Sequence, residues 1–274
     1  MMSSMPDNTE SLAALIASIR GSAKYRDVCT EVISNIGARE LVKRRNLKEA
    51  IQATRNTLHQ VSAAYLNSKE HYTRWLAELS MAVQSQGSSA VRDVCTRIIG
   101  THASTRERLP MLDQFYTTIL AGLPPIHSVV DIACGLNPLT LPWMPLASDA
   151  AYYAYDISES MMGFLTACLS LLGVQCYAQA CDVLQCCPTQ KVDVALLLKA
   201  IPCLELIDKR AVHTLLHSIQ AEVIIVSFPV RSLGGKNKGM AEYYNAHFRS
   251  LLAHETWDIQ RFDFASEQVF LVRK

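Results

Sequence analysis

The chain has 274 residues, 50% of them hydrophobic and 19% charged, so it can bury a core as one large domain or two smaller ones. Its net charge of +1 excludes a global attraction to nucleic acid, and any such attraction must be local. The sequence shows no signal-peptide pattern and no apolar run of roughly 20 residues, so we expect a cytoplasmic protein without a membrane span. Nine scattered cysteines without a C-x-x-C pair indicate free thiols and no metal site.

The amino-terminal part of the chain has the apolar spacing of helices up to about Ser85, with Asn46 and Ser68 as candidate helix starts. A polar stretch that contains glycine and several serines follows, and such stretches are typical of boundaries. We therefore predict a helical bundle domain over residues 1–88 and a second domain over residues 89–274.

This helical region carries uneven charge. Between Arg20 and Gln60, nine basic residues stand against four acidic ones. One interpretation is a solvated helix face, and the other is a surface that follows a phosphate backbone. The candidate contacts to such a backbone are Arg20, Lys24, Arg44, Arg45, Lys48 and Arg55.

Residues 128–138 indicate a short apolar strand that breaks at Gly135 and feeds a helix. Glycine accepts backbone angles that other residues avoid, and Pro138 can open a helix. This is the first unit of a doubly wound α/β sheet, in which ligands lie beyond the carboxyl ends of the strands. Further strands are expected at 151–155, 175–181, 192–198 and 223–228, an antiparallel edge hairpin at 257–264 and 268–272, and helices at 91–99, 106–120, 158–171 and 208–220.

Two carboxylates follow predicted strands. Asp156 is placed to accept hydrogen bonds from ribose hydroxyls, and Asp182 is a candidate acceptor for an adenine amino group. The dinucleotide pattern G-x-G-x-x-G is absent, because Ala133 stands where a first glycine would be and no further glycine follows Gly135. This disfavours NAD and leaves S-adenosylmethionine, which has no pyrophosphate to bind.

A cluster of polar residues at 102–108 comes just before the first strand, where it could fold over the cofactor. The alternative is a capped, charged helix start, with Ser104 or Thr105 as the cap.

After the fifth strand, residues 230–240 contain three glycines and three cations. A basic, glycine-rich loop can wrap a phosphate, and the alternative is an ordinary surface loop. The candidate nucleic-acid contacts in this loop are Arg231, Lys236, Lys238 and Met240.

Sequence blocks at 102–108, 131–138, 197–202 and 227–240 occur together in this order, and with them the chain resembles the aminoglycoside-resistance 16S rRNA (guanine(1405)-N(7))-methyltransferase family. The similarity runs through most of the chain. It implies a Rossmann-like S-adenosylmethionine-dependent methyltransferase fold, with a mostly parallel seven-stranded sheet, and an N-terminal helical bundle domain. It also implies methyl transfer from S-adenosylmethionine to N7 of guanine 1405 in the decoding site of the 30S subunit, giving aminoglycoside resistance. The expected partner is 16S rRNA, without DNA or membrane, and a monomer is expected.

The resemblance further implies site residues. The cofactor site would contain Tyr65, His102, Ala103, Ser104, Thr105, Arg106, Glu107, Arg108, Ala133, Gly135, Asp156, Asp182, Val183 and Leu198. Lys199, Arg108 and Met240 would position the substrate, and Tyr65 would cover the cofactor from the helical domain. A position that often bears glutamine in the family matches Asp208 here, so its contact stays open.

The expected chemistry needs no general base, because guanine N7 is a hydrogen-bond acceptor without a proton. The sequence offers no convincing catalytic dyad. Two rival hypotheses are a small-molecule methyltransferase on the same fold and an RNA-binding protein with an inactive cofactor pocket. The basic helical region and cationic loop disfavour the first, and the carboxylates Asp156 and Asp182 disfavour the second.

Overall fold

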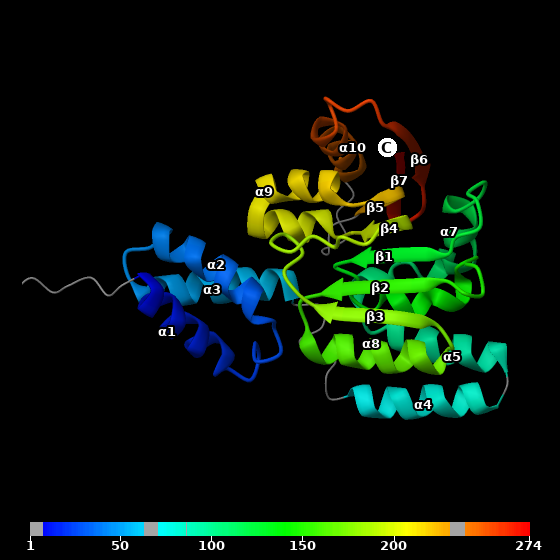
Figure 1. The fold of residues 1–274 in the computed structure, drawn as a ribbon, viewed down its shortest axis with the longest axis horizontal. Helices are drawn as coiled ribbons and strands as arrows, with labels where there is room; N and C mark the ends of the chain where they lie inside the picture. Colours follow the sequence, from blue (N-terminus) through cyan, green and yellow to red (C-terminus); the bar gives the residue numbers. More distant parts are fainter. Residues whose placement is uncertain (1–7, 63–70, 86, 231–238) are drawn as a thin grey trace, which may run out of the picture.

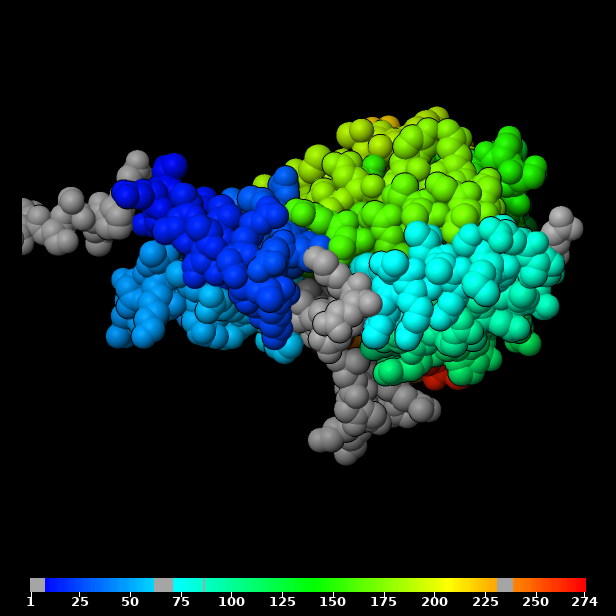
Figure 2. Space-filling model, turned by 90° about the horizontal axis from the view of Figure 1, so that it is seen from below, coloured from blue at the N-terminus to red at the C-terminus, as the bar shows by residue number. Residues whose placement is uncertain are grey.

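The computed structural model describes residues 8–62, 71–85, 87–230 and 239–274. It is built around one seven-stranded sheet with helices on both faces (Figure 1). Helices α1, α2 and α3 form a separate group beyond the edge to which the arrows of β1, β2 and β3 point (Figure 1). Figure 2 shows the same group, in shades of blue, beside the rest of the molecule. In the described part of the chain, no helix is long and apolar enough to cross a membrane.

The sheet has the strand order β3-β2-β1-β4-β5-β7-β6. Strands β1 to β5 pair in parallel, whereas β7 lies antiparallel to both β5 and β6. The predicted, mostly parallel seven-stranded sheet with an antiparallel edge hairpin is thus confirmed. The strands are β1 (Ser128–Ile132), β2 (Ala151–Asp156), β3 (Gln175–Ala180), β4 (Val192–Leu198), β5 (Ala221–Pro229), β6 (Asp258–Asp263) and β7 (Glu267–Arg273).

Two hydrophobic cores cover the faces of this sheet. One face packs against α4 (Tyr72–Gln84), α5 (Ser88–Ile99), α7 (Leu112–Ile119) and α8 (Glu159–Leu171). The other packs against α9 (Ile201–Ser218) and α10 (Met240–Leu251). Burial on both faces explains why β4 is an almost continuous apolar run.

The helices α1 (Asn8–Arg20), α2 (Thr30–Lys43) and α3 (Leu47–Ser62) share a third core. We call them the helical unit, and the rest of the described chain the sheet unit. Helix α4 does not belong to the helical unit, because its Tyr72 stacks on Phe164 of α8, with ring centroids 4.5 Å apart. The division after residue 88 stays a prediction, and this packing favours a boundary before α4. Ser68 lies outside the described residues.

The helical unit is tied to the start of α8. The carboxylate of Asp27 accepts hydrogen bonds from the Ser158 hydroxyl and from the Ser160 N–H, the latter at 3.0 Å. The Cys29 N–H donates to the Ile157 carbonyl at 2.9 Å. Ser158 also caps α8, as predicted, by accepting from the Met161 N–H at 3.3 Å.

Several local predictions are wrong. The helix expected over 106–120 is divided into α6 (Ala103–Arg106), a 3-10 turn η2 (Leu109–Met111) and α7, because Pro110 lacks an N–H donor. The turn after β1 feeds a proline-containing 3-10 helix, η3 (Asn137–Trp143), instead of an α-helix. The helix expected from Asp208 already begins at Ile201, and Asp208 lies at a kink within it. Helix α10 was not predicted.

Candidate active site

The backbone turns sharply at the carboxyl ends of two neighbouring strands. After β1, Ala133 has φ 53° and Gly135 has φ 52°, and after β4, Lys199 has φ 58°. Residues other than glycine rarely adopt this left-handed region, and such strain is concentrated at functional sites. Because β1 and β4 are paired, the two turns lie at the same edge of the sheet.

Asp156, at the end of β2, holds the turn after β1. One carboxylate oxygen accepts from the Gly135 N–H at 2.9 Å, and the other accepts from the Ile157 N–H at 2.7 Å. The residue is only 2% exposed. Asp156 is therefore a buried carboxylate at the carboxyl end of a parallel strand, the place where sheets of this kind bind ligands.

Asp182 lies just beyond β3 and contacts the helical unit. Its carboxylate accepts from the Asn35 amide of α2 at 2.7 Å and from the Leu184 N–H at 3.0 Å. Burial raises the pKa of this carboxyl group, and the two hydrogen bonds oppose that shift. Asp182 and its buried neighbour Val183 therefore lie where both units meet the sheet edge.

His102 packs directly against the glycine of the first turn. A Cβ atom on Gly135 would lie 3.0 Å from Cε1 of the His102 ring. Burial, together with the charges of Arg108 and Lys199, lowers the pKa of His102 to about 4, so the ring is neutral at pH 7. Its Nδ1 lies 3.0 Å from the Ser104 hydroxyl. The segment 102–108 thus lies against the turn that follows β1.

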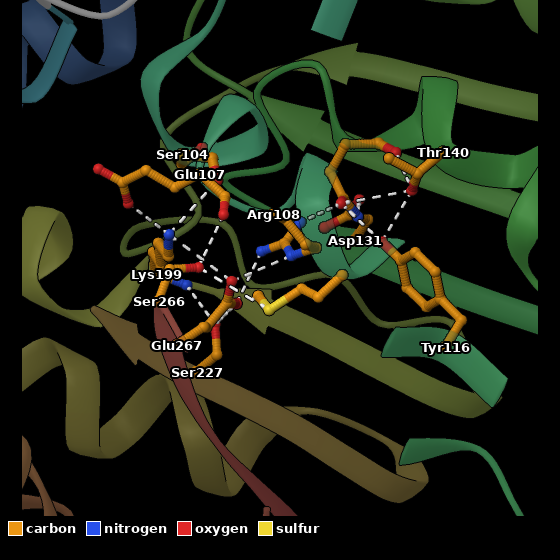
Figure 3. A network of polar contacts seen from close by, with 12 residues as sticks. Ser104, Glu107, Arg108, Tyr116, Asp131, Thr140, Lys199, Ser227, Ser266 and Glu267 are labelled. Atoms are coloured by element: carbon orange, nitrogen blue, oxygen red, sulfur yellow. Dashed lines mark hydrogen bonds and ion pairs between the residues drawn. The ribbon is translucent and has the colours of Figure 1, made fainter. Parts of the chain in front are cut away.

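A buried ion pair connects this segment to the last strand (Figure 3). The guanidinium of Arg108 donates two hydrogen bonds to Glu267, at 3.0 and 2.7 Å, and the side chains are 1% and 0% exposed. Although burial opposes both charges, Glu267 raises the pKa of Arg108, and Arg108 and Lys199 lower the pKa of Glu267. Both groups are therefore charged at neutral pH.

Lys199 also contacts the carboxylate of Glu267. Its Nζ donates to Glu107 at 2.7 Å and lies 3.6 Å from Glu267 (Figure 3). Its backbone N–H donates to the Ser227 hydroxyl at 3.0 Å, and that hydroxyl donates to Glu267. Lys199 and Arg108 were predicted as site residues from the sequence. Glu267, which contacts both of them, was not predicted.

The hydrogen bonds of Arg108 continue to residues next to the turn that follows β1. Arg108 donates at 2.7 Å to the Asn137 side-chain oxygen, and the Asn137 amide donates to Asp131 at 2.9 Å. Asp131 also accepts from the Tyr152 hydroxyl at 2.7 Å. Burial raises the pKa of Asp131 to about 6, although both hydrogen bonds oppose the shift. These contacts fix the positions of β1, η3 and the 102–108 segment relative to one another.

The candidate RNA contacts differ in their surroundings. Lys24, Arg45 and Lys48 are exposed, and the exposed Arg44 donates to Glu40 at 2.7 Å. Arg20 pairs with Thr30 and Glu159, and Arg55 donates to the Ser18 carbonyl at 3.2 Å, so both also hold helices together. Met240 begins α10 after Gly239, which has φ 74°. Tyr65, Arg231, Lys236 and Lys238 lie outside the described residues.

Metal ligands and reactive thiols were not predicted. Within the described ranges, no group of three or more His, Cys, Asp or Glu side chains is arranged to hold a metal ion. All nine cysteines are free thiols.

Asp208, whose contact with the cofactor was left open, lies at the junction with α2, where it pairs with Arg39.

A mostly parallel seven-stranded sheet with its last strand inserted antiparallel beside the fifth, and with carboxylates at the ends of the second and third, defines an S-adenosylmethionine-dependent methyltransferase fold. The model of one family, described as ribosomal RNA methyltransferase (FmrO), matches residues 21–272. The chain belongs to this family of ribosomal RNA methyltransferases.

Similar proteins cover nearly the whole chain. It is 34% identical to a 16S rRNA (guanine(1405)-N(7))-methyltransferase of Micromonospora rosea, over 93% of this chain and 94% of that protein. It is 36% identical to a protein of the same name from Frankia casuarinae, over 92% and 90%. The crystal structure of the 16S rRNA methyltransferase RmtF in complex with S-adenosyl-L-homocysteine matches with a TM-score of 0.82 at 30% identity, over 97% of this chain and 98% of that one. The 16S rRNA methylase RmtB matches with a TM-score of 0.76 at 25% identity, over 96% and 98%.

Proposed function

We propose that this protein transfers a methyl group from S-adenosylmethionine to N7 of guanine 1405 of 16S rRNA. The observation that carries the proposal is the family match over residues 21–272. The geometry supports it, because the carboxylates of Asp156 and Asp182 lie at the ends of paired strands, where this fold binds ligands.

The residues present fit an adenosyl cofactor. Asp156 would accept the ribose hydroxyls, and Asp182 would accept from the adenine amino group, with Val183 beside it. The 102–108 segment, fixed by Arg108 and Glu267, would cover the methionine part. Ala133, Gly135 and Leu198, at the ends of β1 and β4, would supply the backbone edge of the site.

The bound cofactor supplies an electrophilic methyl group on a positively charged sulfur. Guanine N7 carries an exposed lone pair and no proton, so the protein needs to align the two groups and to exclude water. Alignment alone can supply up to about 7–11 kcal/mol of the barrier. Arg108 and Lys199 are neutralised by Glu267 and Glu107, so the floor of the site adds little net charge next to the sulfonium.

The helical unit would dock on the ribosomal RNA, and the segment from Arg231 to Met240 would reach the target base. Asp27 and Asn35 hold the helical unit against the sheet unit. Docking of the helical unit on the RNA would therefore also orient the sheet unit. We propose that the substrate is the assembled 30S subunit in the cytoplasm and that the enzyme acts as a monomer. A methylated N7 is no longer an acceptor and carries positive charge, so a polycationic aminoglycoside would be repelled.

The test is incubation of the purified protein with 30S subunits and isotope-labelled S-adenosylmethionine, followed by mass-spectrometric mapping of the modified nucleotide. The proposal expects one methyl group on N7 of guanine 1405 and a loss of aminoglycoside binding to the treated subunits. Methylation of another nucleotide, or of a small molecule only, would contradict it.

A further inference from the structure

A hollow of about 660 Å³ opens at the junction between the helical unit and the sheet unit, between α2 and α9. Figure 1 shows these two helices near one another, at the side of the sheet where the helical unit lies. Its lining contains four cationic side chains and a single carboxylate. The lining residues are Ala38, Arg39, Val42, Lys43, Asp208, Lys209 and Arg210.

The carboxylate of the hollow is already neutralised. Asp208 pairs with the Arg39 guanidinium and accepts from the Arg210 N–H at 2.9 Å. The excess positive charge therefore comes from three other side chains. Lys209 and Arg210 are exposed, and Lys43 is 61% exposed, with Glu40 of its own helix 3.4 Å away. Glu40 also accepts from Arg44 at 2.7 Å, so it does not balance Lys43 alone.

The walls of the hollow are held at a fixed separation. Arg39 of α2 donates at 2.7 Å to the carbonyl of Ile207 in α9, in addition to its pair with Asp208. Val42, which is 80% exposed, adds an apolar side chain to this cationic lining. Cations around an apolar contact suit a sugar–phosphate backbone, which presents anionic oxygens and ribose carbons together.

We propose that the hollow between α2 and α9 binds the phosphate backbone of the ribosomal RNA substrate, with Lys43, Lys209 and Arg210 as its phosphate contacts. This inference rests on the proposed function. Lys43 is the last residue of α2 and directly precedes the exposed Arg44 and Arg45. RNA bound here would contact the helical unit and the sheet unit at once, which fixes the angle at which the target base approaches the site.

The test compares two double charge reversals. Lys209→Glu with Arg210→Glu changes the hollow, and Lys191→Glu with Arg273→Glu is the matched control, since both control residues lie at the opposite edge of the sheet. Binding to 30S subunits is measured by competition over a series of salt concentrations. Affinity for S-adenosyl-L-homocysteine, the thermal unfolding midpoint, and methylation by the wild-type protein are measured in parallel.

The expected result is weaker 30S binding by the hollow variant than by the control. The slope of log affinity against log salt should fall by about 0.7–0.9 for each lost phosphate contact. Cofactor affinity and unfolding should match the control. Equal affinities and slopes in the two variants would overturn the proposal, and so would weaker binding with an unchanged slope, which would indicate a protein partner. If the wild-type protein itself methylates no 30S subunits, the proposed function fails instead.

Discussion

Arg108 and Glu267 lie 159 residues apart in the sequence, yet they form a two-bonded ion pair that is almost completely shielded from solvent. Glu267 begins β7, which is inserted beside β5, and Arg108 ends the segment expected to cover the cofactor. The pair therefore links the position of the last strand to that of the 102–108 segment.

Glu267→Gln should destabilise the protein by about 3–5 kcal/mol, because it leaves Arg108 buried without its counter-charge. It should also weaken binding of S-adenosyl-L-homocysteine, since the 102–108 segment loses its anchor. Urea unfolding and calorimetry measure the two effects. Asp263→Asn is the control, because its partner Arg261 is 37% exposed and the loss should stay below about 1 kcal/mol. A similarly small loss for Glu267→Gln would show that the ion pair has no structural role.

Gly135→Ala should weaken cofactor binding at least tenfold, because the new Cβ would lie 3.0 Å from the His102 ring. The left-handed backbone angle adds about 1–2 kcal/mol of strain. Gly122→Ala is a matched control, because Gly122 has φ 76° but nothing lies within 4 Å of its Cβ position. Both variants should lose stability, and only Gly135→Ala should lose affinity in calorimetry. Equal affinities would remove this contact from the site.

The pH dependence of stability tests the buried imidazole. The pKa of His102 falls from an ordinary 6.5 to about 4 on folding, so between these values the unfolded chain binds more protons. His102 therefore contributes stability above pH 6.5 that is lost as the pH falls toward 4, about 3 kcal/mol in total. Asp131, whose pKa is raised by burial, acts in the opposite direction, so the comparison must be with a variant. His102→Asn should flatten the decline in urea unfolding between pH 6.5 and 4.5, and an unchanged slope would contradict it.

The strands of the sheet could be predicted because each one corresponds to a pattern of neighbouring residues in the sequence. The apolar run of β4 and the glycine turn after β1 are properties of neighbouring residues, and the sheet confirms both. The Asn46 helix start is equally local, since its side-chain oxygen accepts from the Glu49 N–H at 2.9 Å.

The features that could not be predicted depend on contacts between residues that are far apart in the chain. Glu267 becomes a site residue only because β7 returns beside β5, a register in which it faces Pro229. Asp208, at the kink in α9, likewise pairs with Arg39, 169 residues earlier. A charge pattern along one helix cannot reveal a partner on another unit.

Asp156→Ala should weaken S-adenosylmethionine binding by about 1–3 kcal/mol, because the ribose hydroxyls would lose a charged acceptor. The Gly135 N–H would lose its partner as well, so Asp156→Asn, which retains one acceptor oxygen, should show the smaller loss. Affinity for 30S subunits should stay the same in both variants. Asp149→Asn, on the surface beside His127, is the control in calorimetry. Wild-type cofactor affinity in Asp156→Ala would refute the ribose assignment.

Met240 tests whether the start of α10 acts in methyl transfer or in docking. Helix α10 packs on the end of β5, where Tyr244 stacks on Phe228 with ring centroids 4.8 Å apart, one residue beyond the Ser227 that holds Lys199. A half-buried thioether there offers a soft contact for a displaced base. Contacts that form only on the way to the transition state affect the rate more than binding.

Met240→Ala should therefore lower the single-turnover methylation rate at saturating 30S by about tenfold, which corresponds to about 1.4 kcal/mol of barrier. Its affinity for 30S, measured by competition, should change by less than about threefold. Met81→Ala, at a position 70% exposed on α4, removes the same side chain away from the site and should leave both values unchanged. A Met240→Ala protein with a normal single-turnover rate and weakened binding would place this residue in docking, because the base would then reach the cofactor without it.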